Sequence, residues 1–293
     1  MKAQARSRGE RAFDFFNVVF MLLFTFTCVY PFYYIFIYSI SDPIQATRGI
    51  LFWPVDVTLD NYKRVFALKG IALATLVSVS ITVISTLMAM FVNGLAGYLL
   101  SRPGMPFRKF IYRTFIVTMY VSGGLIPNFL LMKYLRLYNT YWIYIIPCVS
   151  AYYMILAKTY IESIPASLEE SAKLDGASYW TILIRIILPL AIPILATIGV
   201  FNAVGKWSDY STTLIYTTDN NLRTLQYILY QYLKSASAIL LESGGADSNL
   251  QRKLTPTSIK MTLVVITVIP ILCVYPYMQR YFVKGIMLGA VKG

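Results

Sequence analysis

The sequence predicts an all-α membrane protein with six transmembrane helices. Of its 293 residues, 57% are hydrophobic and only 13% are charged, whereas soluble domains are about a quarter charged. Its apolar runs are long enough to cross a bilayer, which takes about 20 residues in a helix. The net charge of +13, carried by basic residues at the ends of loops, is typical of cytoplasmic loops near anionic lipid.

The chain is expected to begin with a cytoplasmic tail, a first span and an external loop. Residues 1–14 form the basic tail. The apolar run from Phe15 to Ile40 is interpreted as a retained span, because it is about twice as long as a signal-peptide core. Residues 41–70 have nearly balanced charge, which suits an external loop.

The second and third spans differ in regularity. Ile71 to Leu100 is the second span, and its many small residues allow helices to approach closely in lipid. A short basic loop follows, which supports a cytoplasmic position. Phe110 to Met132 is the third span, interrupted by Ser122-Gly123-Gly124 and by Pro127-Asn128. Lipid cannot satisfy backbone groups that such breaks set free, so this part should face protein or a wet cavity.

The remaining spans complete the domain over residues 15–283. Tyr141 to Ile161 is the fourth span, Ile182 to Trp207 the fifth and Ile259 to Val283 the sixth. A polar loop at 162–180 lies inside, and an external loop at 208–258 lies outside. The tail at 284–293 then ends in the cytoplasm, as does the N-terminus.

The external loop should contain an amphipathic helix on the outer membrane surface, followed by a flexible tip at Gly244-Gly245. Its apolar residues recur at helical spacing: Leu222, Leu225, Ile228, Leu229, Tyr232 and Leu233.

The polar loop reads as a short helix, a glycine elbow and a second helix. Ser167 and Glu170 have the spacing of a capping box, which satisfies free N–H groups at a helix start. Gly176 is a natural stop in the left-handed conformation. Ser178 can cap the second helix, which continues into the fifth span. A plain cytoplasmic connector with helix caps is the alternative interpretation.

This stretch resembles the EAA loop of ABC importer permeases. Glu170-Ser171-Ala172 fills the Glu-Ala-Ala core, with Ser where the family usually has Ala. Asp175-Gly176-Ala177 and Ile186-Ile187-Leu188-Pro189 fill the rest. Leu59-Asp60-Asn61-Tyr62 and the segment from Gln279 to Gly293 are also similar to carbohydrate-importer permeases of the MetI-like, binding-protein-dependent family. The resemblance covers nearly the whole chain.

The resemblance implies a transport function in the bacterial inner membrane. Glu170, Ser171, Ala172, Leu174, Asp175, Gly176 and Ala177 would form the coupling helix that docks on a cytoplasmic ATPase. Glu170 could instead cap its own helix. The expected partners are a sister permease in a heterodimer, two ATPase subunits, an extracytoplasmic solute-binding protein and membrane lipid. Alternating access would move the substrate without covalent chemistry in this chain.

The resemblance is closest to the oligosaccharide class. Gly-Gly-Leu-Ile-Pro at 123–127 and Trp207 after the fifth span mark a subgroup that includes importers of plant or algal polysaccharide fragments. Length and basic character also resemble the smaller membrane subunit of alginate importers. Acidic oligosaccharides such as alginate fragments are therefore the expected substrates. Polar and aromatic side chains of the third to fifth spans are the candidates for the substrate path: Tyr120, Asn128, Tyr152, Tyr153, Asn202, Lys206, Trp207 and Asp209. Tyrosine and tryptophan also form interfacial belts in any membrane protein.

The residue types in the sequence argue against catalysis, metal binding and nucleotide binding by this chain. The chain has no histidine, which removes histidine-based catalysis and histidine metal ligands. Cys28, Cys148 and Cys273 lie far apart, so no zinc or redox motif is indicated. Scattered basic residues disfavour nucleic-acid binding. Gly199 to Gly205-Lys206 has five intervening residues where a phosphate-binding loop has four, so ATP and Mg²⁺ are expected on the separate ATPase and no cofactor on this chain.

Other transport and catalytic classes remain as alternatives. A permease of the same architecture could carry peptides or another solute, because the loop does not distinguish substrates. An ion-coupled carrier usually has carboxylates within its spans, and here Asp209, at the outer end of the fifth, is the nearest. Backbone carbonyls can nevertheless bind sodium. A membrane-embedded enzyme is disfavoured by the missing histidine and by the lack of paired carboxylates.

Overall fold

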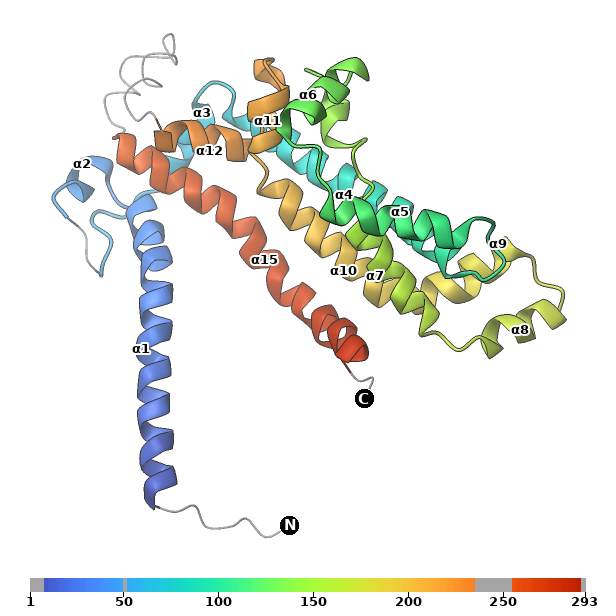
Figure 1. The fold of residues 1–293 in the computed structure, drawn as a ribbon. Coiled ribbons are helices and arrows are strands. Elements are labelled where there is room, and N and C mark those ends of the chain that lie inside the picture. The colour runs from blue at the N-terminus through green and yellow to red at the C-terminus, as the bar shows by residue number, and fades with distance from the viewer. Residues whose placement is uncertain (1–7, 50–51, 235–254, 291–293) are drawn as a thin grey trace. The chain divides into compact units, whose positions relative to one another are not determined.

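The described part of the chain is helical throughout. The computed structural model describes residues 8–49, 52–234 and 255–290, with backbone alone at Arg8, at Arg11 and over 277–290. Helices joined by turns make up these ranges, and no β-strand occurs within them (Figure 1). The prediction of an all-α fold is confirmed. The expected tip at Gly244-Gly245 lies outside the described residues.

The elements follow one another as α1 (Arg8–Ser39), α2 (Pro43–Ala46), α3 (Asp60–Ala67), α4 (Ile71–Ser101), α5 (Arg108–Tyr120), α6 (Leu125–Tyr134), the 3₁₀ turn η1 (Tyr141–Tyr144), α7 (Ala151–Glu162), α8 (Ser167–Leu174), α9 (Tyr179–Ile182), the π-helical η2 (Leu183–Ile187), α10 (Leu188–Trp207), α11 (Ser211–Tyr216), the 3₁₀ turn η3 (Asn220–Leu222), α12 (Leu225–Lys234) and α15 (Pro256–Ala290).

Four helical stretches of the described chain are long and apolar enough to cross a membrane. They are Ala12–Ser39, Ile71–Ser101, Tyr179–Trp207 and Pro256–Pro276. These correspond to the first, second, fifth and sixth predicted spans. The segments expected to form the third and fourth spans contain shorter helices.

The third predicted span is divided where the glycines stand. Helix α5 ends at Tyr120 and α6 begins at Leu125, with non-helical backbone between them. Gly124 has a φ of +81°, which L side chains rarely adopt. The predicted break at the glycines is confirmed, but Pro127 makes no break. It lies in the first turn of α6, where a missing N–H costs no helical hydrogen bond.

The fourth predicted span is α-helical only in its second half, after the 3₁₀ turn η1. Residues 145–150 are not helical, and α7 begins at Ala151. The fully buried Asn93 of α4 satisfies this backbone. Its Nδ2 donates to the carbonyl of Cys148 at 2.9 Å, and its Oδ1 accepts from the amide of Ser150 at 2.8 Å. One side chain thus replaces hydrogen bonds that lipid could not supply.

The chain divides into two compact units. The first contains Met1–Lys69 and Tyr232–Val268, and the second contains Gly70–Gln231 and Ile269–Gly293. In the first unit, Asn61 holds the end of α1, because its Nδ2 donates to the carbonyls of Ser39 and Ser41, each at 2.8 Å. The hydroxyl groups of Tyr62 and Ser39 lie 2.7 Å apart. The Leu59–Tyr62 motif is therefore a structural clamp.

The amphipathic helix predicted in the external loop is present as α12. Leu225, Ile228, Leu229 and Tyr232 are buried within the protein, whereas Leu233 is exposed. The backbone amide of Leu225 donates to Ser78 Oγ of α4 at 2.8 Å. The apolar face of this helix therefore packs against protein and not on the outer membrane surface, which corrects that expectation.

Three helices form the core of the second unit. Helices α4, α7 and α10 contact one another pairwise (Figure 1). Their buried cluster includes Tyr98, Ala157 and Ile194. Glycine permits the close approach of α4 to α7, because a Cβ on Gly97 would lie 2.6 Å from Cβ of Ala157 and 2.9 Å from the amide nitrogen of Lys158.

We expect Gly97→Ala to destabilise the protein by about 1–3 kcal/mol, because the new methyl group would overlap backbone that cannot move freely. Gly205→Ala, also in a helix, is the matched control. Its Cβ meets nothing within 4 Å, so helix propensity should make it neutral or stabilising by up to about 1 kcal/mol. Thermal unfolding of the two purified variants measures the difference. Equal midpoints would contradict the packing argument.

Candidate functional site

The polar loop between α7 and α9 folds as a helix, an elbow and a second helix. Helix α8 ends at Leu174, and Gly176 has a φ of +79°. The amide of Gly176 donates to the carbonyl of Lys173 at 3.0 Å, and that of Ala177 to the carbonyl of Ala172 at 2.9 Å. These two bonds define a Schellman motif. The elbow predicted at Gly176 is confirmed.

The start of α8 differs from the prediction. Its N-cap is Ala166, and no side chain caps it. Ser167 instead occupies the first helical position, so the predicted capping box with Glu170 is not formed. Backbone carbonyls perform part of that role, since the amides of Glu169 and Glu170 both donate to the carbonyl of Ala166 at 3.0 Å.

The second helix of the loop runs continuously into the fifth span. Ser178 caps it as predicted, because its Oγ accepts from the amide of Thr181 at 3.3 Å. The π-helical η2 connects α9 to α10. Pro189 follows directly and lacks the N–H that an α-helix would use at this point. Its position accounts for the wider turn, a feature that is frequent at functional sites.

The predicted coupling residues fall into two groups. Glu170, Ser171, Leu174 and Asp175 are exposed. Leu174 is an exposed apolar side chain, with 89% of its surface accessible. Ala172 and Ala177 are partly buried and pack against the core cluster of α4, α7 and α10. The two alanines therefore pack on the protein's own core, and among the predicted coupling residues Leu174 is the large apolar side chain that remains exposed.

Glu169 is a functional candidate that the sequence analysis did not single out. It is the buried residue of α8, with 8% of its surface exposed. Its carboxylate pairs with the guanidinium of Arg102, just past the end of α4. That guanidinium also lies 4.3 Å from the centre of the Tyr98 ring, a cation–π geometry. The pair joins α8 directly to α4.

A second group of charges lies at the start of the loop. Glu162, at the end of α7, accepts hydrogen bonds from Arg108 and, at 2.7 Å, from Lys158. Arg108 also donates through Nε to the carbonyl of Leu100 at 2.6 Å. The ammonium group of Lys158 lies 4.6 Å from the centre of the Tyr112 ring. We call the Arg102–Glu169 pair and the Arg108–Glu162–Lys158 group the two ionic clamps.

The predicted substrate-path residues do not form one group. Tyr120, Asn128 and Tyr152 are exposed on α5, α6 and α7. Tyr153 packs against the core cluster, with its ring centre 5.8 Å from that of Tyr152. Asn202 is buried and directs its Nδ2 towards Thr86 Oγ1 of α4 at 3.3 Å. Asn202 thus has its expected polar partner, and the contact holds α10 to α4.

Two of the candidates meet at the end of α10. Lys206 donates from Nζ to the carbonyl of Tyr144 at 2.8 Å. Asp209 accepts from Ser211 Oγ at 2.8 Å and from the amide of Thr212 at 3.1 Å, both in the first turn of α11. Their charges are opposite and interact through space. Lys206 and Asp209 therefore lie close to the backbone at the end of η1.

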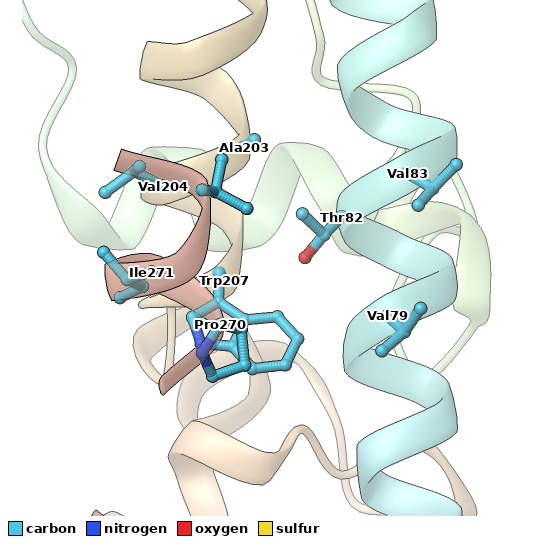
Figure 2. A pocket seen from close by; sticks show the side chains of 9 residues that line it. Val79, Thr82, Val83, Ala203, Val204, Trp207, Pro270 and Ile271 are labelled. Atoms are coloured by element: carbon cyan, nitrogen blue, oxygen red, sulfur yellow. The ribbon is translucent and has the colours of Figure 1, made fainter. Parts of the chain in front are cut away.

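Trp207 lines a separate pocket of about 180 Å³ within the second unit. Figure 2 shows its walls, formed by Val79, Thr82 and Val83 of α4, Ala203, Val204 and Trp207 of α10, and Pro270, Ile271 and Val274 of α15. The exposed lining of this pocket is entirely apolar. The Thr82 hydroxyl is buried without a hydrogen-bond partner among the described residues. The pocket can hold an apolar group or the apolar face of a ring.

The residues described above are better suited to binding a ligand or a partner than to catalysing a covalent reaction. Within the described ranges, no group of three histidine, cysteine, aspartate or glutamate side chains could hold a metal ion. The charged side chains of the two ionic clamps are engaged in ion pairs, whereas Glu170 and Asp175 are exposed. The most organised feature is thus the helical loop, which has an exposed tip and a rigid base.

Comparison with known proteins places the chain among transport proteins. A family model described as "Binding-protein-dependent transport system inner membrane component" matches residues 1–288. The polygalacturonan/rhamnogalacturonan transport system permease protein YtcP of Bacillus subtilis (strain 168) is 37% identical over 290 residues, which cover 97% of this chain and 99% of the relative. Protein LplC of the same organism is 34% identical over 291 residues, covering 98% and 97%.

A solved structure agrees with these relatives. It is the crystal structure of a bacterial ABC transporter involved in the import of the acidic polysaccharide alginate. One of its chains matches with a TM-score of 0.85 and 29% sequence identity, covering 96% of this chain and 100% of that chain.

We expect Glu169→Gln to destabilise the protein by about 1–3 kcal/mol, because it leaves the largely buried Arg102 without its counter-charge. This value is below that of a fully buried pair, since 24% of the Arg102 side chain is exposed. Glu170→Gln, one residue further on and exposed, is the matched control and should change stability little. Thermal unfolding provides the measurement. Charge reversal in the double variant Arg102→Glu/Glu169→Arg should recover part of the loss, and equal effects at both glutamates would refute the clamp.

Proposed function

Because the chain belongs to the family of binding-protein-dependent transport system inner membrane components, we propose that it is the permease subunit of an ATP-driven oligosaccharide importer. It works by alternating access, and ATP and Mg²⁺ bind to separate ATPase subunits. The observation that carries this proposal is the loop around α8. A rigid helical tip with exposed Glu170, Leu174 and Asp175 is suited to dock on a motor protein.

The contacts of the loop supply a route for movement. The ionic clamp between Glu169 and Arg102 joins α8 to α4. The continuous helical path through α9 and η2 joins the elbow to α10. A push on the exposed tip would therefore reach two long spans at once. The Schellman elbow keeps the tip from bending, because its two backbone bonds fix the chain at Gly176.

The topology follows from the same assignment. Six membrane crossings, two of them made by the divided segments, place the loop and both termini in the cytoplasm. Helices α5 and α6 have no buried side chain, although they belong to a predicted span. The sister permease covers this face in a heterodimer, which removes its apolar side chains from lipid and provides the polar surroundings that the break at Val121–Gly124 requires.

Acidic oligosaccharides are the proposed substrates. A polygalacturonan/rhamnogalacturonan permease as relative and an alginate transporter as structural match support a uronate-containing chain. The net charge of +13 and Lys206 beside the backbone of Tyr144 suit carboxylate groups. An extracytoplasmic solute-binding protein delivers the sugar, and Trp207 provides an aromatic face for a ring.

The proposal is tested by reconstitution in proteoliposomes with the sister permease, the ATPase and the cognate binding protein. ATP-dependent uptake of oligogalacturonate or alginate oligosaccharide is the expected result. An ATPase variant that binds but does not hydrolyse ATP is the control, and uptake should stop. Uptake that continues with this ATPase and follows an ion gradient would show an ion-coupled carrier. Uptake of peptides but not of sugars would overturn the substrate class.

We expect Gly176→Val to uncouple ATP hydrolysis from uptake, because a β-branched residue is strained at a φ of +79°. Uptake per ATP hydrolysed should fall at least about tenfold if the strain of roughly 1–3 kcal/mol reshapes the elbow. Gly104→Val, in an exposed cytoplasmic turn where a Cβ has open space, is the matched control. Normal uptake per ATP in the Gly176 variant would contradict the role of the elbow.

A further inference from the structure

The pocket beside Trp207 has a chemical character that the transport of a sugar does not explain. It encloses about 180 Å³ between α4, α10 and α15 (Figure 2). Its exposed surface is entirely apolar, and the hydroxyl of Thr82 is buried. A sugar hydroxyl or a peptide group that entered this pocket would leave water without gaining a hydrogen bond, which is unfavourable. The pocket therefore favours an apolar ligand.

The pocket is open to molecules outside the protein. Val79 and Val83 of α4 are 45% and 52% exposed, and Val204 of α10 and Val274 of α15 are 38% and 45% exposed. All four side chains line the pocket. Each of the three helices thus presents accessible apolar surface to a ligand, so the pocket is a surface groove and not a closed gap in the core.

Hydrocarbon is the medium that surrounds helices of this kind. The chain belongs to a family of inner membrane components. Helices α4, α10 and α15 contain three of the described stretches that are long and apolar enough to cross a membrane. An apolar groove between such helices is filled either by lipid or by another protein, because water gains nothing from apolar walls.

The two faces of α4 distinguish lipid from a packed helix. Helices that pack together in lipid place small residues at the contact. The buried face of α4 follows this rule, and it includes Ala74, Ser78, Ser85, Ala89 and Gly97. The face at the pocket carries large, exposed side chains instead, namely Leu76, Val79, Val83, Leu87 and Phe91. These side chains would hold a second backbone at a distance, whereas a flexible acyl chain can follow them.

This exposed stripe on α4 is long enough to guide an acyl chain. Its residues recur every three or four positions, so they lie on one side of the helix. From Leu76 to Phe91 the helix rises about 22 Å, at about 1.5 Å per residue. One leaflet of hydrocarbon is about 15 Å deep. In the proposed importer the sister permease covers α5 and α6, and neither helix lines the pocket, which leaves the groove to lipid.

We propose that this pocket binds one acyl chain of a membrane phospholipid, which completes the packing between α4, α10 and α15. The chain contacts Val79 and Val83 on one side and Val204 and Val274 on the other. It supplies dispersion contacts that the three helices lack at this point, because a space without partner atoms forfeits them. The inference rests on the membrane location of the chain and not on the sugar that it carries.

Fluorescence of Trp207 tests the inference in the assembled transporter. Nanodiscs contain phosphatidylglycerol with either brominated or ordinary acyl chains, and bromine quenches a tryptophan only when the two are close together. A transporter with Trp207→Phe supplies the signal of all other tryptophans, which is subtracted. Brominated chains should quench the Trp207 signal of the wild type. Ala203→Phe should lower the quenched fraction at least about twofold, because the new ring takes the space of the chain.

Ile192→Phe is the matched control, because Ile192 belongs to the same helix, is 54% exposed and does not line the pocket. It should leave the quenching unchanged. Val83→Phe also fills the groove and decides the test if Ala203→Phe does not fold.

Three results would overturn the lipid site. They are no quenching of Trp207 in the wild type, equal quenching in the filling variants and in Ile192→Phe, and protection of Trp207 by oligogalacturonate, which would assign the pocket to the sugar. Uptake by the same wild-type transporter separates this inference from the proposed function. Sugar uptake without quenching would remove the lipid site and leave the importer in place.

Discussion

A backbone polar group in hydrocarbon must find its partner within the protein, and this constraint governs the whole second unit. A long helix satisfies this constraint with the hydrogen bonds of its own backbone. Where the chain leaves the helix, as it does before α7, another side chain must supply the bonds. Asn93 supplies them from α4 to Cys148 and Ser150. Because those bonds need α4 and α7 in close contact, the small residues at Gly97 and Ala157 are part of the same solution.

The charged residues at one end of this bundle follow a different rule. Ionic groups are used there to fix the helical loop. The two ionic clamps connect the loop to the segment around Leu100. Ala172 and Ala177 add apolar contacts with the core. The loop therefore has a base fixed by ion pairs and apolar contacts, and an exposed tip.

The first unit uses polar side chains to fix the end of α1. Asn61 and Tyr62 hold the residues at the end of α1. Burial raises the pKa of the Tyr62 hydroxyl, while its hydrogen bond with Ser39 acts in the opposite direction. The hydroxyl thus stays neutral and remains available for that bond near neutral pH. The Leu59–Tyr62 motif therefore has a structural role here, because two of its residues connect the loop to the end of α1.

Local chemistry determined much of this protein from the sequence alone. The apolar runs specified helices, Gly176 specified a left-handed elbow, and Ser178 specified a cap, because each depends only on neighbouring residues. The glycines at 123 and 124 likewise specified a break. The sequence also contained two adjacent glutamates, but a helix turns by about 100° between them, so only one can face inward.

Tertiary structure decided that Glu169 faces Arg102 and that Glu170 is exposed. It also decided that Asn93 pairs with residues 148 and 150, and that α12 buries its apolar face in protein. These outcomes depend on the register between helices that are far apart in the chain. No local pattern encodes that register, because it is set by how the side chains of α4, α7 and α10 fit together.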